Sequence, residues 1–475
     1  MNYETVIGLE VHVQLRTQTK LFCGCSTAFG SEPNTQVCPV CLGQPGVLPV
    51  LNRQALRYSV KSALALHCTI AEHTKFDRKN YYYPDLPKNY QISQYDMPYS
   101  RGGYLDIRVD GKEKRIGLTR IHLEEDAGKL VHSTGNYSDV DLNRTGTPLM
   151  EIVTEPDIRS PQEAYAFLTL LRLTLRYIGV SDCNMQEGSL RCDANISLRP
   201  EGRKELGTKV EIKNLNSFKA VQAALEYEME RQEDELDSGE KIIQETRLWD
   251  ADRQETRSMR TKEGEEDYRY FPEPDLPPFT LSRDDVSDIR KDIRELPSER
   301  EKRFVEEYSI PAYDAGVIIQ DREVADFFEA CARSTGDAKE ASNWVMGEIM
   351  RAMNDRKAAL QDLNISADSL SDLIGLIKKG TVSKKIARES VFPVMLEEGK
   401  VPEEIVREKD LEQKSDAGEL EAWITEAIEK NPKAVEDVRN GKKKAIGALV
   451  GYVMKQSKGQ ANPGMVNRML SEKLQ

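Results

Sequence analysis

The segment that most constrains the fold of this chain is residues 6–15, where apolar and polar side chains alternate strictly. The apolar positions are Ile7, Leu9, Val11, Val13 and Leu15, and the positions between them hold Gly8, Glu10, His12 and Gln14. A period of two predicts a half-buried strand whose apolar face packs on a core. Its other face carries a carboxylate, an imidazole and an amide at intervals of about 7 Å. A solvated sheet face has the same alternation, so this strand alone does not indicate a site.

Two later segments repeat the pattern. Residues 187–196 place Arg191, Asp193 and Asn195 on one face, and residues 209–213 alternate up to Lys213. Capping residues and apolar periodicity predict helices over 52–66, from Ser160 to Gly179, and over 218–232. We therefore expect an α+β fold with an antiparallel sheet that packs one face on helices and leaves the other wet.

The length of 475 residues predicts more than one domain. A proline-rich run at 271–278 indicates a boundary, helix signals replace strand signals after it, and a charged linker covers 403–416. We predict a sheet domain over 1–292, an all-helical domain over 293–405 and a small helical C-terminal domain over 406–475.

The charge of the chain is uneven. A net charge of −13 argues against a protein that coats nucleic acid over its whole surface. Residues 438–475 nevertheless hold eight Lys or Arg against Glu472 alone, namely Arg439, Lys442, Lys443, Lys444, Lys455, Lys458, Arg468 and Lys473. This basic segment suits a polyanion, although a solvated helical face is the alternative. Without an apolar run of about 18 residues or a secretory signal, we expect a cytoplasmic protein without a membrane span.

Four of the eight cysteines lie in two close pairs, Cys23 with Cys25 and Cys38 with Cys41. A C-x-C and C-x-x-C arrangement supplies the four thiolates of a tetrahedral zinc site. Disulfides are the weaker alternative in a reducing compartment. Since four cysteines leave no open coordination position, we expect this zinc to be structural.

Acidic residues gather in two further segments. Arg120, His122 and Glu124 share one face of a predicted strand, and Glu125 falls on the other face or at the strand end. Glu151 interrupts an apolar run, so its charge must be paired or bound to a metal. Carboxylates beside an imidazole favour Mg²⁺.

Residues 76–94 form a loop rich in aromatic and cationic side chains, including Lys79, Tyr82 and Lys88. Such a loop can stack a base and hold phosphates, although a surface loop fixed by tyrosine packing has the same composition. The chain has no P-loop and no G-x-G-x-x-G motif. A metal cluster surrounded by cations suits phosphoryl transfer or a metal-dependent nuclease, and the spacing does not separate these two.

A family resemblance covers essentially the whole chain. It rests on VIGLEVHVQL, FCGC with VCPVCLGQPG, RKNYYYPDLPKNYQISQ, RIHLEEDAGK, EGSLRCDANIS, KVEIKNLNSF and KGQANP, which occur in this order. Together these runs closely resemble the B subunit of the glutamyl-/aspartyl-tRNA amidotransferase. The resemblance implies a cradle-like sheet domain, a helical domain and a C-terminal tail domain that grips tRNA.

The resemblance also implies an activity. In that family, ATP and Mg²⁺ serve to phosphorylate the side-chain carboxylate of Glu-tRNA(Gln) or Asp-tRNA(Asn), and ammonia from a separate amidase-type glutaminase subunit displaces the phosphate. A small third subunit clasps the pair. A tRNA-binding scaffold without catalysis of its own is the competing class. Carried over to this chain, the candidates are Glu10, His12, Glu125 and Glu151 for Mg²⁺ and Lys79, Tyr82, Lys88, Arg191 and Lys213 for substrate or phosphate. Asp193 and Asn195 are candidates either for supporting the residues that make the direct contacts or for contacting the nucleotide.

Overall fold

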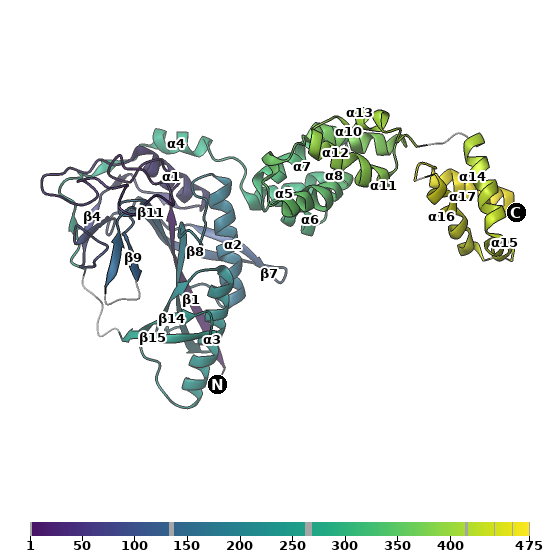
Figure 1. The fold of residues 1–475 in the computed structure, drawn as a ribbon. Helices are drawn as coiled ribbons and strands as arrows, with labels where there is room; N and C mark the ends of the chain where they lie inside the picture. The colour runs from purple at the N-terminus through teal and green to yellow at the C-terminus, as the bar shows by residue number, and fades with distance from the viewer. Residues whose placement is uncertain are drawn as a thin grey trace. The chain divides into compact units, whose positions relative to one another are not determined.

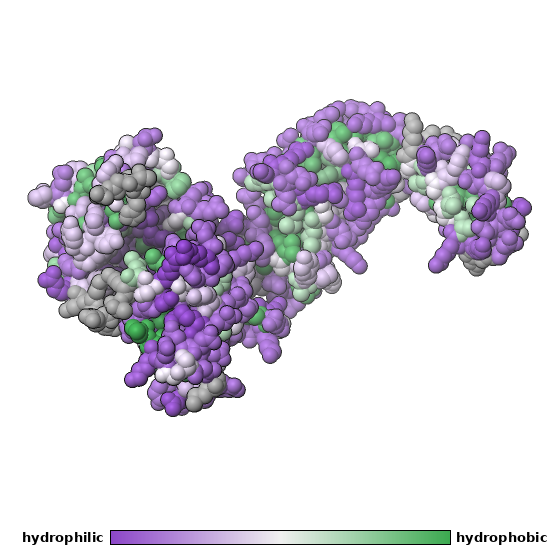
Figure 2. Space-filling view, turned by 60° about the horizontal axis from the view of Figure 1, so that its bottom comes forward, coloured by the Kyte–Doolittle hydropathy of each residue, from purple (hydrophilic) through white to green (hydrophobic). Residues whose placement is uncertain are grey.

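The computed structural model describes residues 2–132, 137–261, 268–413, 417–440, 442–457 and 459–474. The chain divides into two compact units, Met1–Leu296 and Pro297–Gln475 (Figure 1). Hydrophilic side chains dominate the face of each unit that is visible in Figure 2. Within the described ranges, no helix is both long enough and apolar enough to cross a membrane.

The first unit is built on a ten-stranded sheet, counted over the described residues, with the order β15-β14-β13-β12-β1-β11-β8-β6-β2 and β7 paired to β8. Neighbouring strands run antiparallel except β13 and β14, which are parallel. The strands are β1 Tyr3–Gln14, β2 Thr69–Ile70, β6 Ser100–Arg101, β7 Tyr104–Val109, β8 Lys112–Glu125, β11 Pro148–Thr154, β12 Leu190–Pro200, β13 Val210–Leu215, β14 Glu245–Asp250 and β15 Glu255–Thr261. The expected mixed fold with a mostly antiparallel sheet is confirmed.

Helices cover the apolar face of this sheet (Figure 1). They are α1 Arg53–Ala65, α2 Pro161–Tyr177 and α3 Phe218–Asp237, close to the predicted ranges, and α4 Arg283–Lys291 follows. Each of the first three begins where a side chain accepts a backbone N–H: Asn52 for α1, Ser160 for α2 and Ser217 for α3. Ile7, Leu9, Val11 and Val13 of β1 are buried in one core with these helices, which leaves the opposite face of the strand for Glu10 and His12.

Short strands fold the loops of the first unit back on themselves. β3 His73–Thr74 pairs with β17 Phe279–Thr280, β4 Asp77–Asn80 pairs with β5 Tyr90–Ser93 and β16 Phe271–Pro272, and β9 Lys129–His132 pairs with β10 Ser138–Asp141. The interpretation of residues 271–278 as a boundary is therefore wrong. The proline-rich run lies between β16 and β17, whose ladders to β4 and β3 tie it to the first unit.

All elements described in the second unit are helical. They are α5 Pro297–Tyr308, α6 Ala312–Ile318, α7 Arg322–Thr335, α8 Ala338–Trp344, η1 Val345–Ile349, α9 Met350–Arg356, η2 Leu360–Asp362, α10 Ala367–Lys378, α11 Lys384–Ile386, η3 Ala387–Val391, α12 Phe392–Glu398, α13 Pro402–Glu408, α14 Ala417–Lys430, α15 Pro432–Arg439, η4 Lys443–Ala445, α16 Ile446–Gln456 and α17 Pro463–Leu474. The helices from α14 onward share a hydrophobic core of their own, which includes Leu420, Ile424, Leu449 and Leu470.

The predicted domain limits differ in detail from these elements. The two units meet at Leu296 and Pro297, a few residues after the predicted limit of 292. The limit at 405 falls inside α13, and the charged linker predicted over 403–416 is helical as far as Glu408. Its last residues, 414–416, and Lys458 of the basic segment lie outside the described residues.

Candidate functional site

The polar face of the sheet carries its charged residues in register. His12 of β1 lies opposite Glu151 of β11 on one side and opposite Arg191 of β12 on the other, and Glu151 lies opposite His122 of β8. One row of four strands therefore reads Arg191, His12, Glu151, His122. The row exists because polar residues occupy the same parity on each strand, so that all four side chains leave the sheet on one face.

Three members of this row, without Arg191, and two further glutamates form a compact group, here called the carboxylate cluster: Glu10, His12, His122, Glu124 and Glu151. His12 Nε2 lies 3.4 Å from Glu151 Oε2 and 3.5 Å from Glu10 Oε1. His122 Nε2 lies 3.4 Å from Glu124 Oε2 and 3.6 Å from Glu151 Oε2. Two sets of ligand atoms, Glu10–His12–Glu151 and His122–Glu124–Glu151, each lie within 4.8 Å of one another and share Glu151.

His122, Glu124 and Glu151 are buried, Glu10 and His12 are partly exposed, and the cluster is strongly polarised. Burial alone would lower the pKa of His12, but its hydrogen bond with Glu151 and the charges of the neighbouring glutamates raise it to about 9. Burial and the charge of Glu151 raise the pKa of Glu10. Burial also acts to raise the pKa of Glu151, but His122 and His12 outweigh it and lower that pKa. Three carboxylates held around two imidazoles form an electronegative centre that suits a divalent cation.

Two cationic side chains beside the cluster, those of Arg191 and Lys213, each form an ion pair with an acidic residue. Arg191 Nη2 donates to Asp126 Oδ1 at 2.9 Å, and Gln14 Nε2 donates to the other oxygen of Asp126 at 2.7 Å. Lys213 Nζ lies 2.8 Å from Asp193 Oδ2, one row further along the sheet. The predicted candidates Arg191, Asp193 and Lys213 thus lie beside Glu10 and His12.

Lys79 approaches the cluster from another layer. It extends from β4, and its ammonium nitrogen lies 4.7 Å from the centre of the Tyr268 ring. Burial acts to lower the pKa of Lys79, but the charges of Glu124, Tyr270 and Glu151 raise it. The lysine is therefore a firmly charged cation next to the glutamates.

A groove opens beside the cluster on the β12 side. Its volume is about 590 Å³, and Arg191 and Asp193 line it together with Lys129, Arg144 and Asn214. Lys129 and Arg144 therefore share this groove with Arg191 of the central row, and the acids Asp141, Glu187 and Asp193 also line it. Asn195 lies further along β12, opposite Gly8, and its buried Oδ1 has no hydrogen-bond partner among the described residues.

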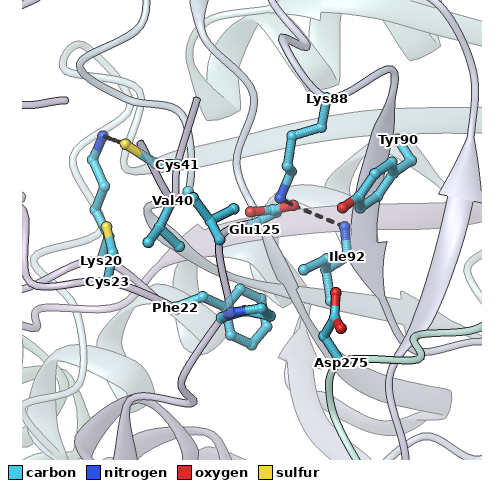
Figure 3. Close-up of a pocket in the computed structure, with 13 residues that line it drawn as sticks. Lys20, Phe22, Cys23, Val40, Cys41, Lys88, Tyr90, Ile92, Glu125 and Asp275 are labelled. Atoms are coloured by element: carbon cyan, nitrogen blue, oxygen red, sulfur yellow. Dashed lines mark hydrogen bonds and ion pairs between the residues drawn. The ribbon is translucent and has the colours of Figure 1, made fainter. Parts of the chain in front are cut away.

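Glu125 does not lie in the cluster. Its carboxylate pairs with Lys88 and accepts a hydrogen bond from the backbone N–H of Ile92 at 2.9 Å (Figure 3). Because neighbouring strand residues point to opposite faces, Glu124 takes the place among the glutamates that the sequence analysis gave to Glu125. Tyr82 is also apart, since 78% of its surface is exposed in the loop after β4.

The four paired cysteines come together as predicted from their spacing. The sulfur atoms of Cys23, Cys25, Cys38 and Cys41 lie within 4.8 Å of one another. The side chain of Lys20, which is fully buried, points at them, and its Nζ lies 3.6 Å from Cys41 Sγ (Figure 3). A hydrogen bond from Cys23 lowers the pKa of Cys41, and Lys20 lowers it further, which favours a thiolate at this position.

The site residues carried over from the family resemblance did not include His122, Glu124, Asp126 or Gln14, although His122 and Glu124 were among the residues whose pattern favoured Mg²⁺. The sequence could have identified Glu124, because Arg120, His122 and Glu124 are spaced two residues apart in β8 and therefore point to the same face. The signal for Asp126 was weaker. It follows the last residue of β8, and only the register of β1 with β12 brings Gln14 and Arg191 to its two oxygens.

Comparisons with known proteins agree on one family. Residues 5–287 match the family model described as the GatB/GatE catalytic domain, and residues 326–474 match the GatB domain. The chain is 58% identical to the aspartyl/glutamyl-tRNA(Asn/Gln) amidotransferase B subunit of Carboxydothermus hydrogenoformans over 99% of each protein. It is 55% identical to the protein of the same name from Moorella thermoacetica over the full length of both. The Bacillus pumilus protein of that name is 56% identical over 100% of this chain and 99% of its own length. The chain therefore belongs to the family of aspartyl/glutamyl-tRNA(Asn/Gln) amidotransferase B subunits.

Proposed function

We propose that this chain converts the side-chain carboxylate of Glu-tRNA(Gln) or Asp-tRNA(Asn) into an amide, with ATP and ammonia as co-substrates. The observation that carries the proposal is the carboxylate cluster, which lies on the central strands of a chain whose full-length relatives are named for this reaction. The chain acts in the proposal as the activating and amidating subunit of a larger enzyme.

The donor set of the cluster fits Mg²⁺. The carboxylate oxygens are hard ligands of the kind that Mg²⁺ prefers, each set adds one imidazole nitrogen, and the two sets that share Glu151 offer places for one or two ions. Glu10, His12 and Glu151 would hold one ion, and His122 and Glu124 would complete the second set with Glu151. A bound Mg²⁺ would offset the negative charge of phosphate oxygens.

The chain's own residues must bring two anions together. The substrate carboxylate and the triphosphate of ATP repel each other and the three glutamates, so cations at fixed positions are needed. Arg191 is oriented by Asp126, Lys213 is oriented by Asp193, and Lys79 is charged beside Glu124. These three cations lie around the cluster and would orient the phosphate groups.

The reaction itself has two displacements. A carboxylate oxygen of the aminoacyl side chain attacks the γ-phosphorus of ATP, and ADP leaves. The lone pair of ammonia then attacks the acyl carbon, the bond from that carbon to the phosphate oxygen breaks, and the nitrogen loses a proton. The phosphorylation step is required because a free carboxylate is a poor acyl donor.

The cysteine group fits a structural Zn²⁺. Four sulfur atoms within 4.8 Å of one another are the donors of a closed tetrahedral site, and Lys20 would offset part of the charge of four thiolates. We propose that this ion fixes the loop that begins after β1 and ends at α1.

Partners and domains complete the proposal. The relatives are named as the B subunit of a larger enzyme, so we propose a heterotrimer with an amidase-type glutaminase that supplies ammonia and with a small third subunit. We also propose that the helical unit comprises a helical domain and a C-terminal tail domain, approximately at the predicted limit of 405, and that the tail binds tRNA(Gln) or tRNA(Asn). The separate core of α14 to α17 and the exposed Lys444 support this role.

The test is amide formation without glutamine. The chain is assembled with its glutaminase partner and the small third subunit, and the complex is supplied with Glu-tRNA(Gln), ATP, Mg²⁺ and ammonium. We expect the wild-type complex to form Gln-tRNA(Gln) and the Glu151→Gln complex to form none. The control is Asp106→Asn, which removes the acid of an exposed ion pair between Asp106 of β7 and Arg115, and it should form Gln-tRNA(Gln) like the wild type. Absence of product from a complex that binds tRNA would support a scaffold instead.

A further inference from the structure

Four tyrosines from distant parts of the first unit form a continuous row of rings, here called the tyrosine row: Tyr81, Tyr268, Tyr270 and Tyr95. The ring centres of Tyr81 and Tyr268 are 5.7 Å apart, and those of Tyr268 and Tyr270 are 6.3 Å apart, both with edge-to-face geometry. Tyr270 and Tyr95 are stacked at 4.1 Å with an angle of 9° between their planes. Tyr81 and Tyr95 follow β4 and β5, and the other two precede β16.

One end of the row borders the carboxylate cluster. The Lys79 ammonium lies 4.7 Å from the centre of the Tyr268 ring and 5.9 Å from that of Tyr81. Burial raises the pKa of Tyr270 to about 12, with further contributions from Glu124 and Glu151, while Lys79 opposes them. Tyr268 and Tyr270 are therefore within electrostatic range of the groups proposed to act on the substrate.

The other end of the row is open. Tyr95 is 59% exposed although Tyr270 covers one of its faces, so the opposite face is accessible to a ligand. None of the four rings belongs to the hydrophobic core of the first unit, which includes other tyrosines such as Tyr99. Core packing therefore does not account for the row.

We propose that the tyrosine row is a stacking platform for the unpaired 3′-terminal nucleotides of the tRNA. Single-stranded nucleic acid is bound by aromatic rings on which successive bases stack, with cations nearby for the backbone. The row has both features, and it leads from an exposed ring to Lys79 beside the cluster. The inference deepens the proposed function and rests on it, because it names how the aminoacyl end reaches the site.

The adenine of ATP is the other base that the row can hold, but the structure favours the tRNA end. The groove on the β12 side has a volume of about 590 Å³ and is lined by the acids Asp141, Glu187 and Asp193 as well as by Lys129, Arg144 and Arg191. Its three cations can contact several phosphates of a triphosphate, whereas the tyrosine row has a single lysine. Two nucleotide substrates would then approach the cluster from different sides of the sheet face. An extended row of rings also matches successive bases better than one adenine.

The test compares tRNA(Gln) that ends in its complete 3′ sequence with tRNA(Gln) that lacks the terminal adenosine. The affinity of the assembled heterotrimer for each tRNA is measured in the absence of ATP. Loss of one stacked base costs about 1–3 kcal/mol, so we expect the wild-type complex to bind the shortened tRNA about 5-fold to about 150-fold more weakly. In Tyr95→Ala, and in Tyr270→Ala, this difference should largely disappear. Tyr95→Phe keeps the ring and should keep the difference, as should Tyr313→Ala, a control at an exposed tyrosine of the helical unit.

Two results would overturn the platform. One is that both alanine variants, like the wild type, bind the shortened tRNA more weakly than the complete tRNA by the same factor. The other is an increased KM for ATP in Tyr95→Ala with the tRNA difference unchanged, which would assign the row to the adenine of ATP. The proposed function is tested separately by amide formation. A wild-type complex that makes Gln-tRNA(Gln) while the alanine variants keep the difference refutes the platform alone. A complex that makes no Gln-tRNA(Gln) but loses the difference in Tyr95→Ala refutes the activity and retains the platform.

Discussion

Glu329 of α7 is the centre of a charge network in the helical unit, and its contribution to the free energy of unfolding can be calculated from the shift of its pKa. Its carboxylate accepts from Arg300 at 3.0 Å, from both terminal nitrogens of Arg303 at 2.8 and 3.0 Å, and from Tyr308 at 3.2 Å, and it also pairs with Arg333. Burial acts to raise the pKa of Glu329, but Arg303 and the other arginines outweigh it and lower that pKa from 4.5 to about 2.

This shift converts to a free energy of unfolding. A fall of that size corresponds to about 3 kcal/mol, which solvent screening around the 68% exposed Arg333 reduces to about 2 kcal/mol. Since the folded pKa is lower than the unfolded one, the contribution is complete above pH 4.5 and is lost as the pH falls towards 2. Glu329→Gln should therefore destabilise the helical unit by about 2 kcal/mol at pH 7. The difference from the wild type should shrink across that window.

The assay is urea unfolding followed by the fluorescence of Trp344, which is fully buried in the helical unit. Trp249→Phe and Trp423→Phe in the background remove the other two tryptophans. Glu306→Gln is the matched control, because Glu306 is 63% exposed and pairs only loosely with Lys302, so its effect should stay below about 0.5 kcal/mol. A Glu329→Gln effect as small as that of the control at pH 7, or one that does not change between pH 5 and pH 3, would refute the reasoning.

Three further predictions concern the proposed sites. Glu151→Gln removes the ligand shared by both sets of the cluster, so amide formation should fall by at least about 100-fold while tRNA affinity stays unchanged, as followed by product formation and filter binding. Cys41→Ser should reduce the bound zinc measured by a colorimetric chelator from one ion to a substoichiometric amount and lower the thermal midpoint of the first unit. Equal zinc contents in wild type and variant would remove the cysteine site. Lys444→Glu should weaken tRNA binding and reduce its salt dependence without changing kcat at saturating tRNA, and an unchanged affinity at every salt concentration would contradict the role of the tail.

The sequence predicts the parts of the site that follow strand periodicity. Alternation in β1 places Glu10 and His12 on the polar face, and the same rule applied to β8 selects Glu124 rather than Glu125. Glu125 was carried over from the family resemblance, but the structure pairs it with Lys88 outside the cluster, because side chains of consecutive strand residues diverge. The register between neighbouring strands then fixes which side chains lie next to each other, such as His12 opposite Glu151, and the periodicity of a single strand does not contain this information.

Features that depend on irregular chain segments were not predictable in this way. Tyr82 was chosen from its loop, but Tyr81 joins the tyrosine row and Tyr82 is exposed, because no period fixes the direction of side chains in a turn. Tyr268 and Tyr270 reach the row only because β16 pairs with β4, a contact between segments far apart in sequence. The same pairing explains why the proline-rich run does not end the first unit.

The position of β1 in the middle of the sheet has a consequence for synthesis of the protein. Both of its neighbours, β11 and β12, are made much later, so both edges of β1 remain without their native partners while the intervening chain emerges, although α1, which shares its core, is made early. At about 5–20 residues per second, the ribosome needs about 7–27 s to reach β11 after completing β1. During that interval the unpaired edges of this half-apolar strand are exposed to other nascent chains. We therefore expect newly made chains to depend on chaperones until β12 has emerged, and slower translation of residues 15–148 to increase aggregation.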